Sequence, residues 1–203
     1  MGAVEDAIEA LEHGQPVVLP TDTVYGLCAS PHDEEAVRRL ARLKGRDEAK
    51  PIALLAGELE QLLEWLPELR GRAEAIACAL LPGPYTLILA NPARRFPWLN
   101  RPNPEAIGVR VPLLPEPARR VIDAVGAVAA TSANLAGGAD ARRVDEIPEQ
   151  LLAGVAAVVD AGELPGVPST VIDCTGPAPV VVREGAVPAA KALERLRSGG
   201  SDQ

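Results

Sequence analysis

Residues 16–27, with the sequence PVVLPTDTVYGL, set the fold class expected for this chain. Residues 16–19 form an apolar run that is typical of a short buried strand. Polar side chains and a glycine follow it, and ligands of open α/β sheets bind beyond the carboxyl ends of strands. Thr21 and Thr23 would point to one side of an extended segment, where both could bind one ligand. Alternatively, these side chains satisfy the backbone of a polar turn.

The sequence on either side alternates between helical and extended patterns. We expect helices over residues 3–13, 34–44, 58–65, 70–80, 116–125, 144–152 and 188–197, and strands over 51–55, 85–89, 107–111, 127–131, 155–159, 170–173 and 179–182. Residues 91–105, rich in Pro, Asn and Arg, should form a loop. Because strands and helices alternate without a break, we predict a single α/β domain over residues 1–198 with flanking helices. The last strands come without helices between them, so the sheet should be mixed. Residues 199–203 should be a frayed tail.

Composition excludes several classes of function. The 203 residues carry a net charge of −8, which argues against attraction of the whole surface to nucleic acid. Aromatic residues make up 2%, too few to recognise single strands by stacking. Three separated cysteines and two histidines form no legible zinc site, and an odd cysteine count without a signal peptide suggests a cytoplasmic protein. No apolar run is long enough to cross a membrane.

Lysine is rare in this chain, and two of its three lysines flank one arginine. Lys44, Arg46 and Lys50 fall within seven residues, where an ammonium and a planar guanidinium together suit a phosphate chain. Alternatively, these cations lie in solvent at the end of a helix, where the helix dipole favours them.

Polar residues also occur at the ends of the later predicted strands. Ser132 and Asn134 follow one strand, Ser169 precedes another, and Arg183 ends a third. Each could equally belong to an ordinary turn or cap. Arg110 lies within an apolar strand and therefore needs a partner. The sequence contains no phosphate-binding glycine loop, no dinucleotide fingerprint and no nucleophile elbow. The residues alone therefore indicate an anion-binding α/β domain.

Seven stretches in order resemble the YrdC/Sua5 family, the threonylcarbamoyl-adenylate synthases. They are residues 20–27, 44–51, 82–86, 109–112, 132–134, 169–173 and 183–185, so that the resemblance spans about residues 5 to 190. It implies a twisted sheet with a deep concave cationic cavity. It also implies a nucleotidyltransferase that converts L-threonine, bicarbonate and ATP, with Mg²⁺, into threonylcarbamoyl-AMP and pyrophosphate. A separate transferase complex would then modify adenosine 37 of tRNA, so any tRNA contact of this chain would be indirect or weak.

The resemblance also assigns roles to single residues. Threonine would be held by Thr23, Arg110 and Ser169, and ATP by Lys44, Arg46, Lys50, Ser132, Asn134 and Arg183. Lys44, Arg46, Ser132 and Asn134 would be the catalytic set, which acts by positioning and charge neutralisation because the reaction needs no protein nucleophile. No protein residue is expected to bind the metal.

Two departures from the family pattern bear on the site. Leu55 stands where many long members have a histidine, and Asp140 stands where a serine is usual. A carboxylate near ATP is unfavourable unless it faces away or meets the metal. Alternative functions are a non-catalytic ATP- or RNA-binding module and a carbamoyl-adenylate enzyme for hydrogenase maturation. The last normally belongs to a much larger chain with zinc-finger motifs, which are absent here.

Overall fold

Nine strands form one mixed sheet in the computed structural model, which describes residues 2–198. The order across the sheet is β7-β1-β2-β6-β3-β5-β4-β8-β9. The strands are β1 (Val17–Pro20), β2 (Tyr25–Ala29), β3 (Ala53–Ala56), β4 (Tyr85–Ala90), β5 (Ala106–Arg110), β6 (Ala127–Ser132), β7 (Ala157–Val158), β8 (Thr170–Asp173) and β9 (Val180–Arg183). The pairs β1–β7, β3–β5 and β4–β8 are parallel and the others antiparallel, which confirms the predicted mixed sheet.

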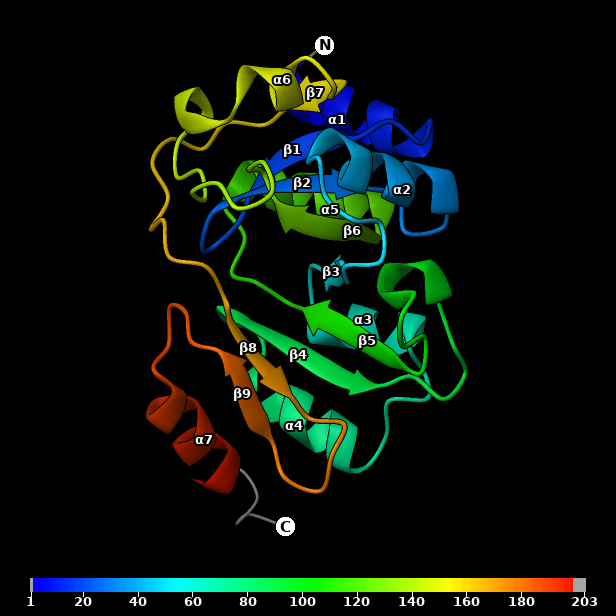
Figure 1. Ribbon diagram of the computed structural model, residues 1–203, viewed down its shortest axis with the longest axis vertical. Coiled ribbons are helices and arrows are strands. Elements are labelled where there is room, and N and C mark those ends of the chain that lie inside the picture. Colours follow the sequence, from blue (N-terminus) through cyan, green and yellow to red (C-terminus); the bar gives the residue numbers. More distant parts are fainter. Residues whose placement is uncertain (1, 199–203) are drawn as a thin grey trace.

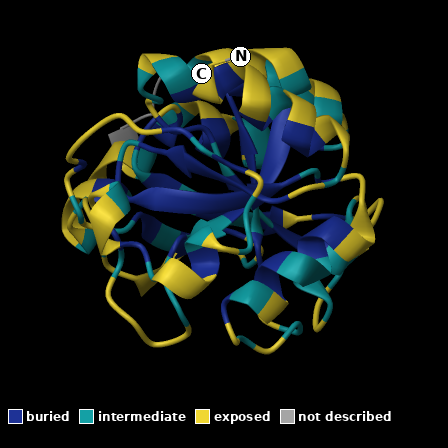
Figure 2. Cartoon of the chain, turned by 90° about the horizontal axis from the view of Figure 1, so that it is seen from above, coloured by how far each residue is buried: buried dark blue, intermediate teal, exposed yellow. Residues whose placement is uncertain are grey.

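Helices cover both faces of this sheet. They are α1 (Ala3–Glu12), α2 (Glu34–Leu43), α3 (Leu59–Trp65), α4 (Arg72–Leu80), α5 (Glu116–Val125), α6 (Glu149–Leu152) and α7 (Ala189–Ser198), with 3-10 turns η1 (Pro97–Asn100) and η2 (Val144–Glu146). The interior strands of the sheet lie buried between helices with exposed outer faces (Figure 2), whereas β9 at its edge is largely exposed. In Figure 1, α1, α6 and β7 lie at one end of the molecule, and α7 and β9 lie at the other.

The two faces of the sheet are covered unequally. Along β2, Leu27 packs into a core shared with α2, α3, α4, α6 and α7, whereas Cys28 packs against α1 and α5 on the other face. The core of the second face takes no buried residue from β4, β5, β8 or β9. Helices α1 and α5 therefore cover one part of the second face, and the remaining part is available for a site.

Several predicted elements need correction. Residues 20–27 are not a loop at a strand end, because Tyr25 begins β2, which pairs antiparallel with β1 as a tight hairpin. The predicted helix over 144–152 divides into η2 and α6, since Pro148 cannot continue a helix from η2. The expected strand at 155–159 shortens to β7, and the expected loop at 91–105 contains η1.

The remaining predicted elements agree with the structure to within about two residues, and residues 116–125 and 170–173 match their predicted bounds. The predicted tail at 199–203 lies outside the described residues. No helix within residues 2–198 is both long enough and apolar enough to cross a membrane.

Candidate active site

A cavity of about 350 Å³ lies on the part of the sheet face that α1 and α5 leave open. Small side chains line it along four neighbouring strands: Gly26, Ala130, Ala53 and Gly108. They leave the room that larger side chains would fill. The cavity reaches from the carboxyl ends of β5 and β6, at Arg110 and Ser132, onto the adjoining face of the sheet at Gly108 and Ala130. A larger groove of about 650 Å³ between α1 and α2 brings together no comparable set of hydroxyls and cations.

Three guanidinium groups and one carboxylate line this cavity. They belong to Arg46, Arg110, Arg183 and Asp140. Ser132 and Ser169 also line it, so five of the nine predicted site residues meet in one place although they are distant in the sequence. The predicted depth and electrostatic potential of the cavity remain predictions.

Arg110 has the partner that its position in β5 requires. Its Nη2 lies 3.0 Å from Asp22 Oδ1 and donates to Thr23 Oγ1 at 3.1 Å. The side chains of Arg110 and Asp22 are 12% and 10% exposed. Burial lowers the pKa of Arg110 and raises that of Asp22, and the ion pair opposes both shifts. Thr23 itself is fully buried, so it lies behind Arg110 and does not line the cavity.

Ser169 and Arg183 lie together beside β4. Thr86 Oγ1 and Ser169 Oγ are 2.7 Å apart, and Arg183 Nη2 donates to Ser169 O at 2.8 Å. Arg183 is close enough to lower the pKa of Arg110 by repulsion. Two guanidinium groups and two hydroxyls therefore border this end of the cavity, as a carboxylate ligand would require.

Lys44 is buried behind Ser132 at the other end. Its Nζ donates to Ser132 O and, at 2.7 Å, to Asn134 Oδ1, which also accepts a hydrogen bond from Ser132 Oγ at 2.7 Å. Burial, together with repulsion by Arg46, lowers the pKa of Lys44 to about 8, while Asp140 opposes that shift. Asp140 also lines the cavity, close enough for its charge to act on Lys44.

If the cavity binds ATP, as the resemblance implies, the low pKa of Lys44 predicts that ATP affinity falls as the pH rises through about 8, because the buried cation is lost. Between about pH 8 and pH 10.5, Lys44 is protonated in the unfolded chain but not in the folded protein. The free energy of unfolding therefore rises with pH over this range. Calorimetric titration with ATP from pH 6.5 to 9.5 measures the binding effect. Lys44→Met should flatten the profile, and Lys191→Met should leave it intact. An unchanged slope in Lys44→Met would contradict the assignment.

The structure does not bring every predicted residue to the cavity. Lys50 is exposed and does not line it, and Asn134 reaches it only through Ser132 and Lys44. Sequence reasoning gave no role to Asp22 or Thr86, although each lies within a stretch that was singled out. Leu55 is fully buried against α1 and α5, so it belongs to the core and does not line the cavity.

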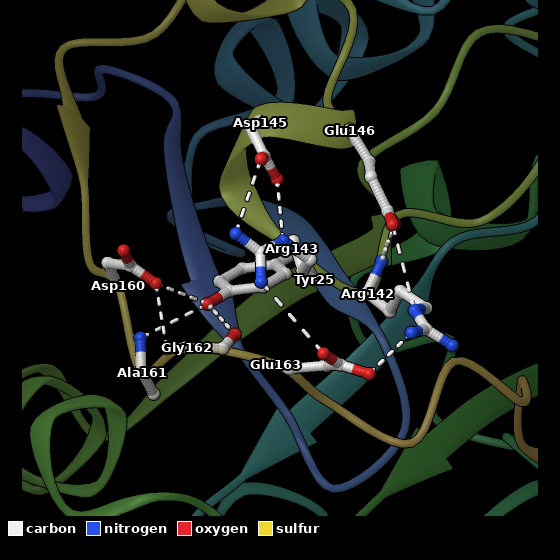
Figure 3. A network of polar contacts seen from close by, with 9 residues as sticks. All are labelled: Tyr25, Arg142, Arg143, Asp145, Glu146, Asp160, Ala161, Gly162 and Glu163. Atoms are coloured by element: carbon white, nitrogen blue, oxygen red, sulfur yellow. Dashed lines mark hydrogen bonds and ion pairs between the residues drawn. The ribbon is translucent and has the colours of Figure 1, made fainter.

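Residues 159–169 connect β7 to β8 and border the cavity with Pro168 and Ser169. Figure 3 shows how this strap is fixed: the Tyr25 hydroxyl lies 2.6 Å from Asp160 Oδ1 and accepts a hydrogen bond from Ala161 N at 3.1 Å. Glu163 pairs with Arg142 and Arg143. Burial, then the hydrogen bond to Asp160, raises the pKa of Tyr25 to about 12, so the phenol stays protonated as a donor.

Tyr25→Phe should lower the free energy of unfolding by about 1–3 kcal/mol, because it removes a hydrogen bond to a charged acceptor and leaves the strap loosely held. Urea denaturation measures this loss. Tyr85→Phe is the matched control, since its hydroxyl accepts one longer bond, at 3.3 Å, from Arg195. Equal losses in the two variants would show that the strap contacts add nothing.

The family model for Sua5, YciO and YrdC proteins, described as "Telomere recombination", matches residues 9–185. The chain belongs to the Sua5/YciO/YrdC family. The residues that line the cavity all lie within the matched range.

Relatives within this family differ in length. The threonylcarbamoyl-AMP synthase of Pyrococcus abyssi is 34% identical over 88% of this chain, which covers 52% of that protein. The putative threonylcarbamoyl-AMP synthase of Mycobacterium tuberculosis is 34% identical over 95% of this chain and 88% of its own length. The crystal structure of P. abyssi Sua5 complexed with L-threonine has a TM-score of 0.83 and 32% identity, covering 95% of this chain and 56% of that one. This chain thus spans about half the length of the Pyrococcus relative.

Proposed function

We propose that this chain is a threonylcarbamoyl-AMP synthase that joins L-threonine, bicarbonate and ATP and releases pyrophosphate. The observation that carries the proposal is one cavity bordered by two sets of anion-binding groups, Arg110 with Ser169 and Arg183 at one end and Arg46 with Ser132 at the other. The names of the family relatives and the threonine bound to P. abyssi Sua5 support the choice of substrates.

The first end would hold the amino acid. Arg110 and Ser169 would bind its carboxylate, and Thr23 would support Arg110 from behind. Its uncharged amine nitrogen attacks the carbon of bicarbonate, water leaves, and a carbamate forms. A binding site that holds amine and acceptor in contact supplies much of the rate, because it converts a bimolecular step into an intramolecular one.

The second end would hold the triphosphate. A carbamate oxygen attacks the α-phosphorus, the bond from the α-phosphorus to the bridging oxygen breaks, and pyrophosphate leaves with that electron pair. Arg46 and the charge of Lys44 would stabilise the negative charge that grows on the leaving group, whereas Arg183, expected from the sequence to hold ATP, lies beside Ser169 at the first end. The described residues contain no cluster of three or more potential metal ligands, so Mg²⁺ would enter with ATP as part of the substrate. Asp140 is the one carboxylate among the lining residues and could share that ion with the phosphates.

The product is a mixed anhydride that hydrolyses readily. A separate transferase must therefore consume it, and we propose that the threonylcarbamoyl group is passed to adenosine 37 of tRNA by such a complex. Direct contact of this chain with tRNA is not required for that scheme.

Pyrophosphate release tests the proposal. Purified protein should release pyrophosphate from ATP when L-threonine and bicarbonate are both present, and omission of either should abolish release. The Lys44→Ala, Arg46→Ala double variant is the negative control. ATP binding without release would leave a non-catalytic nucleotide-binding protein and overturn the proposal. Equal rates with L-serine would keep the chemistry and overturn the assignment of threonine.

A further inference from the structure

Three separate segments meet at residues 22–23, behind the cavity. Arg110 of β5 contacts both residues, Leu113 N donates to Asp22 Oδ2 at 3.3 Å, and Gly166 N donates to Thr23 O at 2.9 Å. The β1–β2 hairpin, the end of β5 and the strap therefore share this anchor. A change at Asp22 would therefore alter the position of the Arg110 guanidinium group, which faces the cavity.

The hydroxyls beside Arg110 form a hydrogen-bond chain with one direction. A guanidinium cannot accept, so Thr23 Oγ1 accepts from Arg110 Nη2 at 3.1 Å. Thr21 Oγ1 donates to the carbonyl of Val24 at 2.7 Å, because a carbonyl cannot donate. Thr23 must therefore donate across the 2.9 Å contact to Thr21. The buried Thr23 hydroxyl is satisfied on both sides and acts on the cavity through Arg110.

The guanidinium of Arg110 is held from one edge. Its Nη2 is occupied by Asp22 and Thr23, and its Nε is enclosed without a partner among residues 2–198. Nη1 forms no hydrogen bond to any described residue, and Arg110 lines the cavity. Nη1 thus remains to donate to a ligand, such as an oxygen of a carboxylate.

Charge explains why a carboxylate is needed behind this arginine. Arg110 is buried near Arg183, and both burial and repulsion act against its charged form. Asp22, itself 10% exposed, is the charged group that compensates. Without it, two like charges would share the end of the cavity, and Arg110 would turn away from its receiving position.

We propose that Asp22 is a positioning residue that orients Arg110 to receive the carboxylate of the amino-acid substrate. The inference rests on the proposed function, because it names a residue that builds its threonine end. It predicts that loss of the Asp22 charge weakens threonine binding selectively, while the ATP end, built from other segments, is preserved.

Asp22→Asn removes the charge and keeps the shape. Titration with L-threonine and, separately, with ATP should show about a 10- to 100-fold weaker dissociation constant for threonine and a change of less than about twofold for ATP. The matched control is Asp123→Asn on the exposed face of α5, where the pair with Arg119 spans 3.9 Å, and it should change neither constant. Equal weakening of both ligands would show a merely structural role and overturn the proposal.

A second cycle tests the route through Arg110. In an Arg110→Lys background, Asp22→Asn should add less than about twofold to the loss in kcat/KM for L-threonine, because the group that it orients is gone. Losses that multiply would overturn the proposal. If Asp22→Asn does not fold, Asp22→Glu and Thr23→Val replace it in the same titrations. Asp22→Glu keeps the charge and should retain part of the wild-type threonine affinity. Thr23→Val should weaken threonine binding several-fold and leave ATP binding unaffected. A wild-type protein that binds ATP but no threonine would instead refute the proposed function.

Discussion

Arg46→Ala should lower kcat/KM for ATP by about two to three orders of magnitude. The Arg46 guanidinium lines the cavity and is fixed by hydrogen bonds to Thr131 Oγ1 at 3.2 Å and to Pro51 O at 2.7 Å. Charged hydrogen bonds to phosphate contribute about 1.5–3 kcal/mol each, and two of them account for a loss of this size. Steady-state rates of pyrophosphate release at saturating threonine measure it.

Arg39→Ala is the matched control for that measurement. Arg39 lies on the exposed side of α2 and donates to Gln15 Oε1, away from the cavity. It should retain the wild-type kcat/KM to within about twofold, since isolated surface contacts of this kind contribute little. If both variants lost activity equally, loss of net positive charge and not loss of a phosphate contact would be the cause.

Gly108→Leu should abolish the binding of both substrates, at least about 100-fold for each. Gly108 lines the floor of the cavity, and a Cβ added there meets Ala53 and Thr86 at an ordinary 3.8 Å. The backbone therefore tolerates a side chain, and the rest of a leucine would extend into the space that the ligands need. Calorimetric titration with each substrate, together with thermal unfolding, separates blocked binding from misfolding.

The graded series at this position provides the control. Gly108→Ala should bind both substrates within a few-fold of wild type, because its methyl group makes only ordinary contacts. Ala90→Leu, at the exposed end of β4, should also leave binding unchanged. A Gly108→Leu protein that folds and still binds ATP normally would place the nucleotide outside this cavity.

The sequence predicted the sheet well where local patterns are strong. It predicted the strand at residues 127–131 and the capped amphipathic helix after Asp33, because neighbouring residues alone indicate burial and capping there. It missed β2, because Tyr25 and Gly26 follow two polar threonines, and the burial of β2 is completed by pairing with the distant strand β6, where Gly26 lies opposite Ser132. Pairing of that kind leaves no local signal.

In the candidate site, too, local sequence predicts some features and pairing between distant residues decides the others. The charge of Arg110 within an apolar strand predicted a partner, and the structure supplies Asp22. Which residue it would be could not be read from spacing, since 88 positions separate the two. Lys44 and Lys50 look equivalent in sequence, yet Lys44 at the C-terminal end of α2 is buried, and Lys50 in the loop before β3 is exposed. Local pattern thus identifies charged candidates, and tertiary pairing decides which of them line the cavity.

The cavity floor of small residues has a consequence for how the two reactants are spaced. Between Ser132 on β6 and Val171 on β8, the sheet has the order β6-β3-β5-β4-β8, and neighbouring strands lie about 4.8 Å apart. Backbone hydrogen bonds therefore fix a span of up to about 19 Å along the sheet between the two ends of the cavity. The spacing of the strands sets the distance between the two ends of the cavity. Side chains at the rim can therefore change which group is recognised at each end without altering that distance.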